Sequence, residues 1–207
     1  MNEEQKELLQ LIRNIANEKG IKEITLDKLY KNEKISQDIL KKYYTSDEDL
    51  VRDILTEERK KFEEIFIDHD FEGYYDAIDI LFTVSRDMAG KFYHLSPSVT
   101  YEWKDVYPEV YQEHIEKRID FIYEKINVNI QKGIISGLYR NDISTELVAR
   151  RYISRLIDLH DPDNFPPEEF SFKKLFEQMF ESFVKSIATE KGLEHFEKKK
   201  KSLGFLS

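Results

Sequence analysis

Apolar residues recur at helical intervals along most of this chain. The first such run, residues 3–18, has an apolar stripe at spacings of three and four, formed by Leu8, Leu11, Ile12 and Ile15. Gly20 then ends the run as a C-cap residue. Good N-cap residues precede three further helical runs, Thr25 before 26–32, Ser36 before 37–43 and Ser46 before a long run that ends near residue 68.

The rest of the chain also shows a helical pattern, without convincing strand alternation. We expect helices at 72–92, 108–133, 144–160 and 168–191, and an irregular segment or short helix over 96–108, where Pro97 and Pro108 interrupt the pattern. The tail after residue 191 carries a run of lysines and is expected to be a frayed helix or disordered. The pattern as a whole predicts an all-α protein.

Composition adds three constraints. The chain has 207 residues, a length that fits one domain or one domain with a small second one. It has no Cys, which excludes disulfides and thiolate chemistry. Residues 1–14 contain no apolar segment of a signal peptide, and no apolar run reaches the ~20 residues that span a bilayer, so we expect a cytoplasmic protein without a membrane partner.

The net charge of −9 argues against a protein that binds nucleic acid over its whole surface. Only a local basic patch could support such a role. Between residues 28 and 42 the chain has five lysines, Lys28, Lys31, Lys34, Lys41 and Lys42, against the two acids Glu33 and Asp38. This local excess of positive charge is what a DNA-reading segment needs.

The same segment has the outline of a helix-turn-helix. Two short helices, 26–32 and 37–43, flank a turn at 33–35, and the second helix of such a pair lies in the major groove. The side chains expected to face inward are Leu26, Leu29, Ile35, Ile39 and Leu40. The second helix would present Ser36, Gln37, Asp38, Lys41 and Lys42, while Tyr43 and Tyr44 divide between a phosphate contact and the core.

Four stretches carry a resemblance to the tetracycline-repressor (TetR/AcrR) family of regulators. They are IANEKG at 15–20, ITLDKL at 24–29, IS at 35–36 and LKKYYTSDEDL at 40–50, and the match runs without gaps from Thr25 to Leu50. The resemblance implies an N-terminal helix-turn-helix DNA-binding domain, 1–46, and a helical ligand-binding and dimerisation domain, 47–207. The implied function is that of a ligand-responsive dimeric regulator, expected to be a repressor, on a palindromic operator.

The resemblance assigns roles on the DNA to individual residues. Ser36 and Tyr43 would position phosphates, with Thr25 contributing through its cap, while Gln37, Asp38, Lys41 and Lys42 would face bases or nearby phosphates. The chain departs from the family at the turn, where Glu33-Lys34 replaces Ala-Gly, and at Asp38, which replaces a small residue. The alternative is therefore a dimeric TetR-fold protein that binds small molecules and has weakened or lost DNA binding.

Aromatic residues are frequent at 13%, with 14 Phe and 12 Tyr, and they thicken in the middle of the chain. By resemblance they would surround a cavity for an apolar or aromatic effector. The expected lining is Phe66, Tyr74, Phe82, Phe92, Tyr93, His94, Tyr101, Trp103, Tyr107, Tyr111 and Phe121. The alternative is a plain core, because aromatic side chains at helical spacing are more often packing than a binding site.

The last two predicted helices resemble the dimerising pair of the family. Their wide apolar faces include the residues expected at a dimer interface, Leu147, Tyr152, Leu156, Phe172, Phe176, Met179, Phe180 and Phe183. Two-fold pairing would bury these faces. The alternative is that they close on the central bundle of a single chain.

Enzyme functions find little support in the sequence. His69-Asp70 and His160-Asp161 look like the dyad of a metal phosphohydrolase, but the rest of that pattern is missing. The five histidines show no metal spacing with one another, and a chain with seven glycines has no Gly-rich phosphate loop. We expect no catalytic residues, metal or cofactor; a metal hydrolase would need several histidines and acids to converge.

Overall fold

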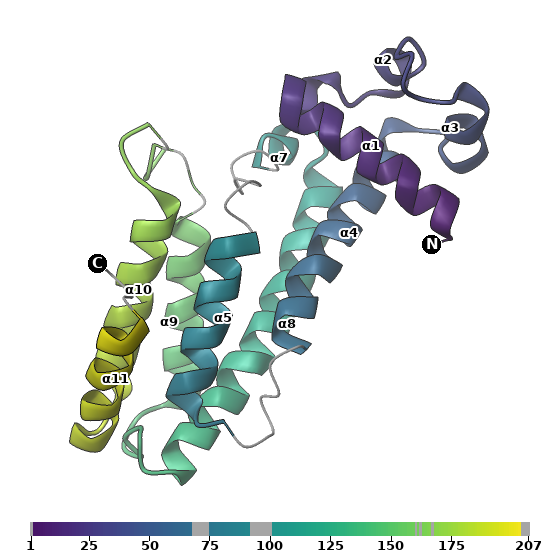
Figure 1. Cartoon of the computed structure of the whole chain (residues 1–207). Coiled ribbons are helices and arrows are strands. Elements are labelled where there is room, and N and C mark those ends of the chain that lie inside the picture. The colour runs from purple at the N-terminus through teal and green to yellow at the C-terminus, as the bar shows by residue number, and fades with distance from the viewer. Residues whose placement is uncertain are drawn as a thin grey trace. The chain divides into compact units, whose positions relative to one another are not determined.

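The computed structural model describes residues 2–67, 75–91, 101–159, 161, 163–166 and 168–203 (Figure 1). These residues form an all-α protein, as predicted; their only β pairing is one isolated bridge between Tyr139 and Ala188. The α-helices are α1 (Glu3–Lys19), α2 (Leu26–Leu29), α3 (Gln37–Tyr43), α4 (Asp47–Ile67), α5 (Ala77–Lys91), α7 (Trp103–Val106), α8 (Pro108–Ile135), α9 (Thr145–Asp158), α10 (Phe172–Ile187) and α11 (Glu190–Leu203). None of these helices is long and apolar enough to cross a membrane.

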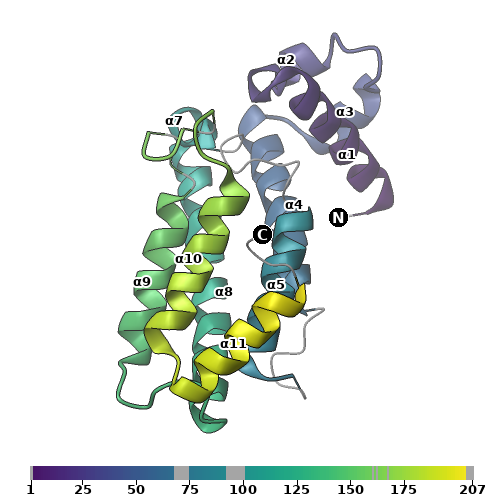
Figure 2. The same ribbon diagram turned by 60° about the vertical axis from the view of Figure 1, so that its left-hand side comes forward.

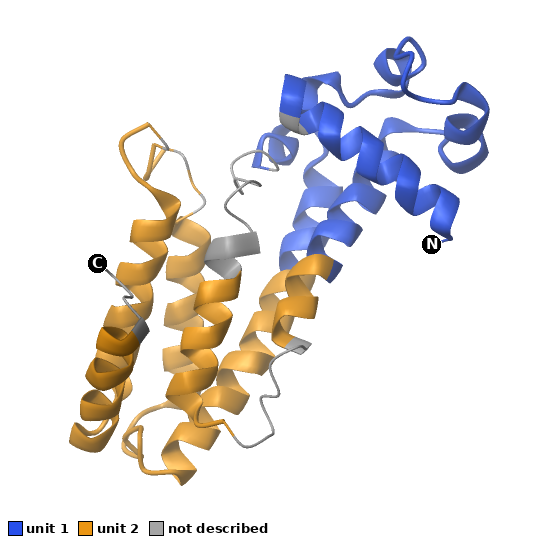
Figure 3. Ribbon diagram, viewed as in Figure 1, with its two compact units in different colours: residues 1–60, 97–116 blue, residues 61–96, 117–207 orange. Residues whose placement is uncertain are grey.

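The chain divides into two compact units (Figure 3). Unit 1 comprises residues 1–60 and 97–116, and unit 2 comprises 61–96 and 117–207. Two long helices, α4 and α8, therefore contribute residues to both. The division after residue 46 is the one that the resemblance implies, whereas the compact units follow packing, which adds the start of α4 and the segment 97–116 to unit 1.

Unit 1 has a core built from the apolar stripes of α1 to α4. The side chains predicted to face inward, Leu26, Leu29, Ile35 and Leu40, are all buried, and Ile39 is partly buried against the same core. The amino-terminal turns of α4 add Leu50 and Val51, while α7 and α8 add Trp103, Val110 and Tyr111. An ion pair closes one side, where Arg13 Nε of α1 lies 2.6 Å from Glu58 Oε1 of α4.

Unit 2 has a separate core shared by the end of α4 and by α5, α8, α9, α10 and α11. Aromatic rings join its helices: Phe82 of α5 stacks on Phe196 of α11 with centroids 5.1 Å apart, and meets Phe180 of α10 edge-on at 5.2 Å. All three side chains are almost completely buried. Figure 2 shows α11 lying across the bundle beside α5.

The C-terminal tail is the main departure from the predicted elements. The helix expected over 168–191 begins at Phe172 and ends at Ile187, and a separate helix, α11, starts at Glu190. Of the two alternatives for the tail after residue 191, a frayed helix or disorder, the residues up to 203 are helical. The break at Ala188 is made by the connector after α8, since Arg140 donates its backbone N–H to Ile187 and Thr189 donates to Leu138. Gly192 allows this approach, because a Cβ there would lie 2.1 Å from the Leu138 carbonyl oxygen.

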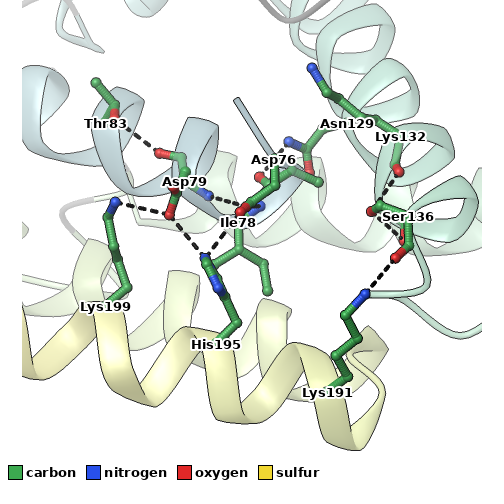
Figure 4. Close-up of polar contacts among 12 residues, drawn as sticks. Asp76, Ile78, Asp79, Thr83, Asn129, Lys132, Ser136, Lys191, His195 and Lys199 are labelled. Atoms are coloured by element: carbon green, nitrogen blue, oxygen red, sulfur yellow. Dashed lines mark hydrogen bonds and ion pairs between the residues drawn. The ribbon is translucent and has the colours of Figure 1, made fainter. Parts of the chain in front are cut away.

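Polar side chains also hold α11 against the start of α5 (Figure 4). His195 Nε2 lies 3.1 Å from both Asp76 Oδ2 and Asp79 Oδ1, and Lys199 Nζ lies 3.0 Å from the same Asp79 oxygen. Asp76 in addition caps α5, accepting from the backbone N–H groups of Ile78 and Asp79. The tail is therefore fixed by both apolar and charged contacts.

These contacts predict a pH dependence. Burial alone would raise the pKa of Asp79, but hydrogen bonds with His195 and Lys199 outweigh it and hold this pKa below the ordinary 3.8. A carboxyl with a depressed folded pKa contributes stability above its unfolded pKa, and that stability is lost as pH falls through the folded value. We expect Asp79→Asn to melt below the wild type at pH 7 and to approach it below about pH 3.8. Melting temperatures across that range test this; a constant difference would contradict it.

Candidate nucleic-acid interface

The helix-turn-helix forms at the predicted place in unit 1. Thr25 caps α2 by accepting the Lys28 backbone N–H at 3.4 Å, and Ser36 caps α3 by accepting that of Ile39 at 3.4 Å. Asp47, the first residue of α4, accepts the Leu26 backbone N–H at 2.6 Å. This last contact joins the start of α2 to the start of α4, so the helix-turn-helix (α2 and α3) is attached directly to α4.

The turn between α2 and α3 is closed by a residue that the sequence interpretation missed. α2 ends at Leu29 and not at residue 32, and in the turn that follows Asn32 Oδ1 accepts the backbone N–H of Lys34 at 3.0 Å. The Asn32 carbonyl then accepts from Ile35, whose side chain is buried as the expected plug of the turn. Asn side chains commonly close such turns, so Asn32 stabilises the turn where the family has Ala-Gly.

The exposed face of α3 carries the side chains expected to meet DNA. Ser36, Gln37, Asp38, Lys41 and Lys42 are all exposed. Gln37 Nε2 donates to the Tyr30 carbonyl at 2.8 Å, and Lys41 Nζ lies 5.4 Å from the centre of the Tyr30 ring. Contacts with Tyr30, at the end of α2, therefore hold the side chains of Gln37 and Lys41 in place.

Tyr43 and Tyr44 lie in different surroundings, the first near the surface and the second in the core, as the sequence indicates. Tyr43 is half-buried, and its hydroxyl lies at the surface among residues of α1. Tyr44 is only 2% exposed, and its hydroxyl donates to Asp53 Oδ2 at 3.1 Å. Burial raises the pKa of Tyr44 above its ordinary value, so this phenol stays protonated at neutral pH and serves the core.

The positive charge near α3 is smaller than a count along residues 28–42 suggests. Three of its five lysines pair with acids that lie outside that stretch: Lys28 with Glu23 at 2.9 Å, Lys34 with Glu18 at 3.9 Å and Lys42 with Glu4 at 2.5 Å. All of these side chains are well exposed, so solvent and salt screen the pairs. The folded surface thus keeps a modest positive patch.

The aromatic residues predicted to line a ligand cavity are distributed over both units. Tyr101, Trp103, Tyr107 and Tyr111 pack with the core of unit 1. Phe66, Phe82 and Phe121 belong to the core of unit 2, where Phe66 and Phe121 meet edge-on at 5.4 Å. Tyr74, Phe92, Tyr93 and His94 lie outside the described residues. Within each unit the described aromatic residues act as core, and their role towards a ligand stays a prediction.

Two hollows among the described residues lie on the face of α9 and α10. They have volumes of about 140 and 670 Å³ and share Arg155, Met179 and Ser182 in their walls. On α9, Leu147 is 58% exposed and Ile157 41%. The other predicted interface residues are less available, since Leu156, Phe176, Met179, Phe180 and Phe183 are buried within the chain itself and Tyr152 and Phe172 are partly buried.

One cluster of potential metal ligands was not expected from the spacing of the histidines. Asp76, Asp79 and His195 offer ligand atoms within 4.8 Å of one another. Only the fold brings them together, because His195 is more than a hundred residues away along the chain. The Lys199 ammonium already contacts Asp79 there, so these side chains act as the polar contacts that fix α11. His69 and His160 lie outside the described residues.

Comparison with known proteins identifies the fold. No family model and no curated protein matches the sequence. Several solved structures match in fold. SmeT in its triclosan complex, described as the repressor of the Stenotrophomonas maltophilia multidrug efflux pump SmeDEF, matches with a TM-score of 0.70 and 12% identity over 91% of this chain and 93% of that chain. The fatty acid degradation regulator FadR from Bacillus halodurans matches with a TM-score of 0.68 and 12% identity over 89% of this chain and 96% of that chain.

A TetR/AcrR-family transcriptional regulator from Thermobifida fusca is similar as well, with a TM-score of 0.66 and 16% identity over 88% of this chain and 97% of that one. These matches extend over nearly the whole chain. The chain therefore has the TetR-family fold. At identities this low the similarity concerns the fold alone.

Proposed function

We propose that this chain is a dimeric, ligand-responsive transcriptional regulator of the TetR family that acts as a repressor on a palindromic operator. The observation that carries the proposal is the capped helix-turn-helix with Ser36, Gln37, Lys41 and Lys42 exposed along α3. A short helix held by its partner helix on one side and polar on the other is what enters a major groove. As a DNA-binding regulator the chain would work in the cytoplasm.

The geometry supports a division of labour along α3. Ser36 at its start and Tyr43 at its end would contact phosphates and so fix the register of the helix, with Thr25 at the start of α2. Gln37 and Lys41 would reach base edges or adjacent phosphates. Asp38, which is exposed on the first turn, could accept from the exocyclic amine of a cytosine, a contact that would restrict the operator sequence.

Dimerisation is proposed for the face formed by α9 and α10. The two adjacent hollows, which share Met179 in their walls, give this face apolar area that a second copy would cover. A two-fold axis there would present two copies of α3 to half-sites about one DNA turn apart, roughly 34–36 Å. The palindromic operator follows from that symmetry.

The effector is proposed to be small and apolar or aromatic. Aromatic residues are abundant in this chain, and two proteins of the same fold are described with triclosan and with fatty acid degradation. An effector can release DNA only by binding more tightly to the state that does not fit the operator. α4 contributes residues to both units, and its first residue, Asp47, bonds to the start of α2. A shift of α4 would therefore displace α2 and α3.

Selection from a random library of DNA duplexes, followed by titrations over a salt series, tests the proposal. We expect one enriched palindromic sequence whose affinity falls steeply with salt, because phosphate contacts release counterions. The Lys41→Ala, Lys42→Ala double variant should weaken binding to it on the order of 30-fold and reduce the salt slope by about 2. Lys198→Ala with Lys201→Ala is the matched control, since it removes two exposed lysines of α11.

A second function stays open because acids pair with Lys28, Lys34 and Lys42. In that case the chain is a dimeric TetR-fold protein that binds small molecules and has lost its operator. No enriched sequence at low salt, in a protein shown to be free of bound effector, would favour this alternative. Equal losses of affinity in the two double variants would remove α3 from the proposed interface.

A further inference from the structure

Two of the side chains proposed to contact DNA are already held by an acid of the same unit. Lys42 Nζ lies 2.5 Å from Glu4 Oε2, and the Tyr43 hydroxyl donates to that same oxygen. Lys42 also lies over the Tyr43 ring, 5.0 Å from its centre. One carboxylate oxygen of α1, Glu4 Oε2, therefore accepts hydrogen bonds from both Lys42 and Tyr43 at the end of α3.

The position of Glu4 is fixed by its own helix. Asn2 caps α1 by accepting the Gln5 backbone N–H at 2.9 Å, and its Nδ2 donates to the Tyr43 hydroxyl at 2.9 Å. Gln5 donates to Asp53 of α4 at 2.8 Å, so the first turn of α1 is anchored on both sides. Glu4 is thereby held in place beside the end of α3.

The contact joins charged groups. Hydrogen bonds from Lys42 and then Tyr43 lower the pKa of Glu4, while the hydrogen bond to Glu4 raises the pKa of Lys42. At neutral pH one anionic oxygen therefore faces an ammonium and a phenol. A non-bridging phosphate oxygen would present the same charge to the same two donors. The side chains of Lys42 and Glu4 remain 57% and 43% exposed, so a phosphate can reach this place from solvent.

We propose that Glu4 is an internal competitor for an operator phosphate and so sets the affinity of this chain for DNA. The inference rests on the proposed function, in which α3 reads the duplex. Without DNA, Glu4 occupies Lys42 and Tyr43 in place of a phosphate. On DNA the two donors must leave Glu4 for the backbone, which brings the freed carboxylate close to a phosphate of the same sign. Both effects weaken every complex that uses this phosphate, specific or not.

The competition would reduce the binding of this chain to random DNA. A complex that has only phosphate contacts would lose a large share of its attraction, whereas base contacts from Gln37 and Lys41 would be unaffected. Glu4 would thus keep the protein from being held on random DNA.

Glu4→Gln keeps the shape of the side chain and removes its charge. We expect this variant to bind the selected operator about three- to tenfold more tightly and a random duplex more tightly by at least as much, with a salt slope steeper by about 0.9. Glu3→Gln is the matched control, because Glu3 lies in the same first turn, is exposed and makes no side-chain hydrogen bond or ion pair among the described residues. It should change affinity less than about twofold, which measures the general effect of one charge and of the helix dipole.

A double-variant cycle separates competition from general electrostatics. In a Lys42→Ala background Glu4→Gln should give no more gain than Glu3→Gln, because the main donor for which Glu4 competes is absent. Equal gains from Glu4→Gln and Glu3→Gln in the otherwise unchanged chain would overturn the inference while leaving the proposed function intact. Absence of DNA binding in the wild type and in all of these variants at low salt would overturn both.

Discussion

Replacing Phe196 by alanine is expected to lower the free energy of unfolding by about 3–5 kcal/mol. The ring is fully buried, it stacks on Phe82 at 5.1 Å and it packs against Phe180 at 5.9 Å. Truncation would remove its contacts with both helices and leave a cavity that the rigid surrounding helices cannot fill. Urea unfolding followed by far-UV circular dichroism measures the change.

The control for this variant lies two residues further along α11. Lys198 is exposed, and Lys198→Ala should change stability by less than about 0.5 kcal/mol. A Phe196→Ala variant that is as stable as this control would mean that α11 does not complete the core of unit 2. A tail as loosely attached as its lysine-rich sequence suggests would give that result.

Helix caps explain why the first fifty residues could be predicted well. Thr25, Ser36 and Ser46 each act within three residues of themselves, so their effect is visible in the sequence, and all three cap helices in the structure. The burial of Leu26, Leu29 and Leu40 follows from helical periodicity in the same way. Local physical rules were sufficient here because the elements are short and their partners are near in sequence.

The features that sequence reasoning missed depend on contacts between distant residues. α10 ends at Ile187 because the connector at 138–140 supplies backbone partners there, and no proline or glycine at residue 188 signals the break. Aromatic periodicity at Phe82 and Trp103 could not distinguish a cavity wall from a core, and within their units both side chains are core. The lysine count near α3 likewise omitted Glu4 and Glu18, acids that only folding places beside these lysines.

Removing the charge of Glu58, which pairs with Arg13, should lower the free energy of unfolding more than removing any other single charge in unit 1. The two side chains are only 9% and 12% exposed, and they join α1 to α4. Glu58→Gln would leave the Arg13 guanidinium in the core without its counter-charge, and burial of an unpaired charge is costly. We expect a loss of about 3 kcal/mol in the free energy of unfolding.

Trp103 allows this loss to be assigned to unit 1. It is the only tryptophan of the chain, and it is buried in the core of that unit, so its fluorescence reports the unfolding of this core. Glu48→Gln is the control, since its partner Arg52 is well exposed and an exposed pair contributes at most about 1 kcal/mol.

An Arg13→Met change combined with Glu58→Gln should recover most of the loss, because no buried charge remains and the methionine fills part of the space of the arginine stem. The single variant would then be destabilised by the charge left behind and not by the loss of packing. If the double variant is instead less stable than Glu58→Gln alone, the arginine stem contributes more than the pair, and the ion pair is secondary to the apolar contact between α1 and α4. Fluorescence-detected urea unfolding of the four proteins, wild type included, decides between these outcomes.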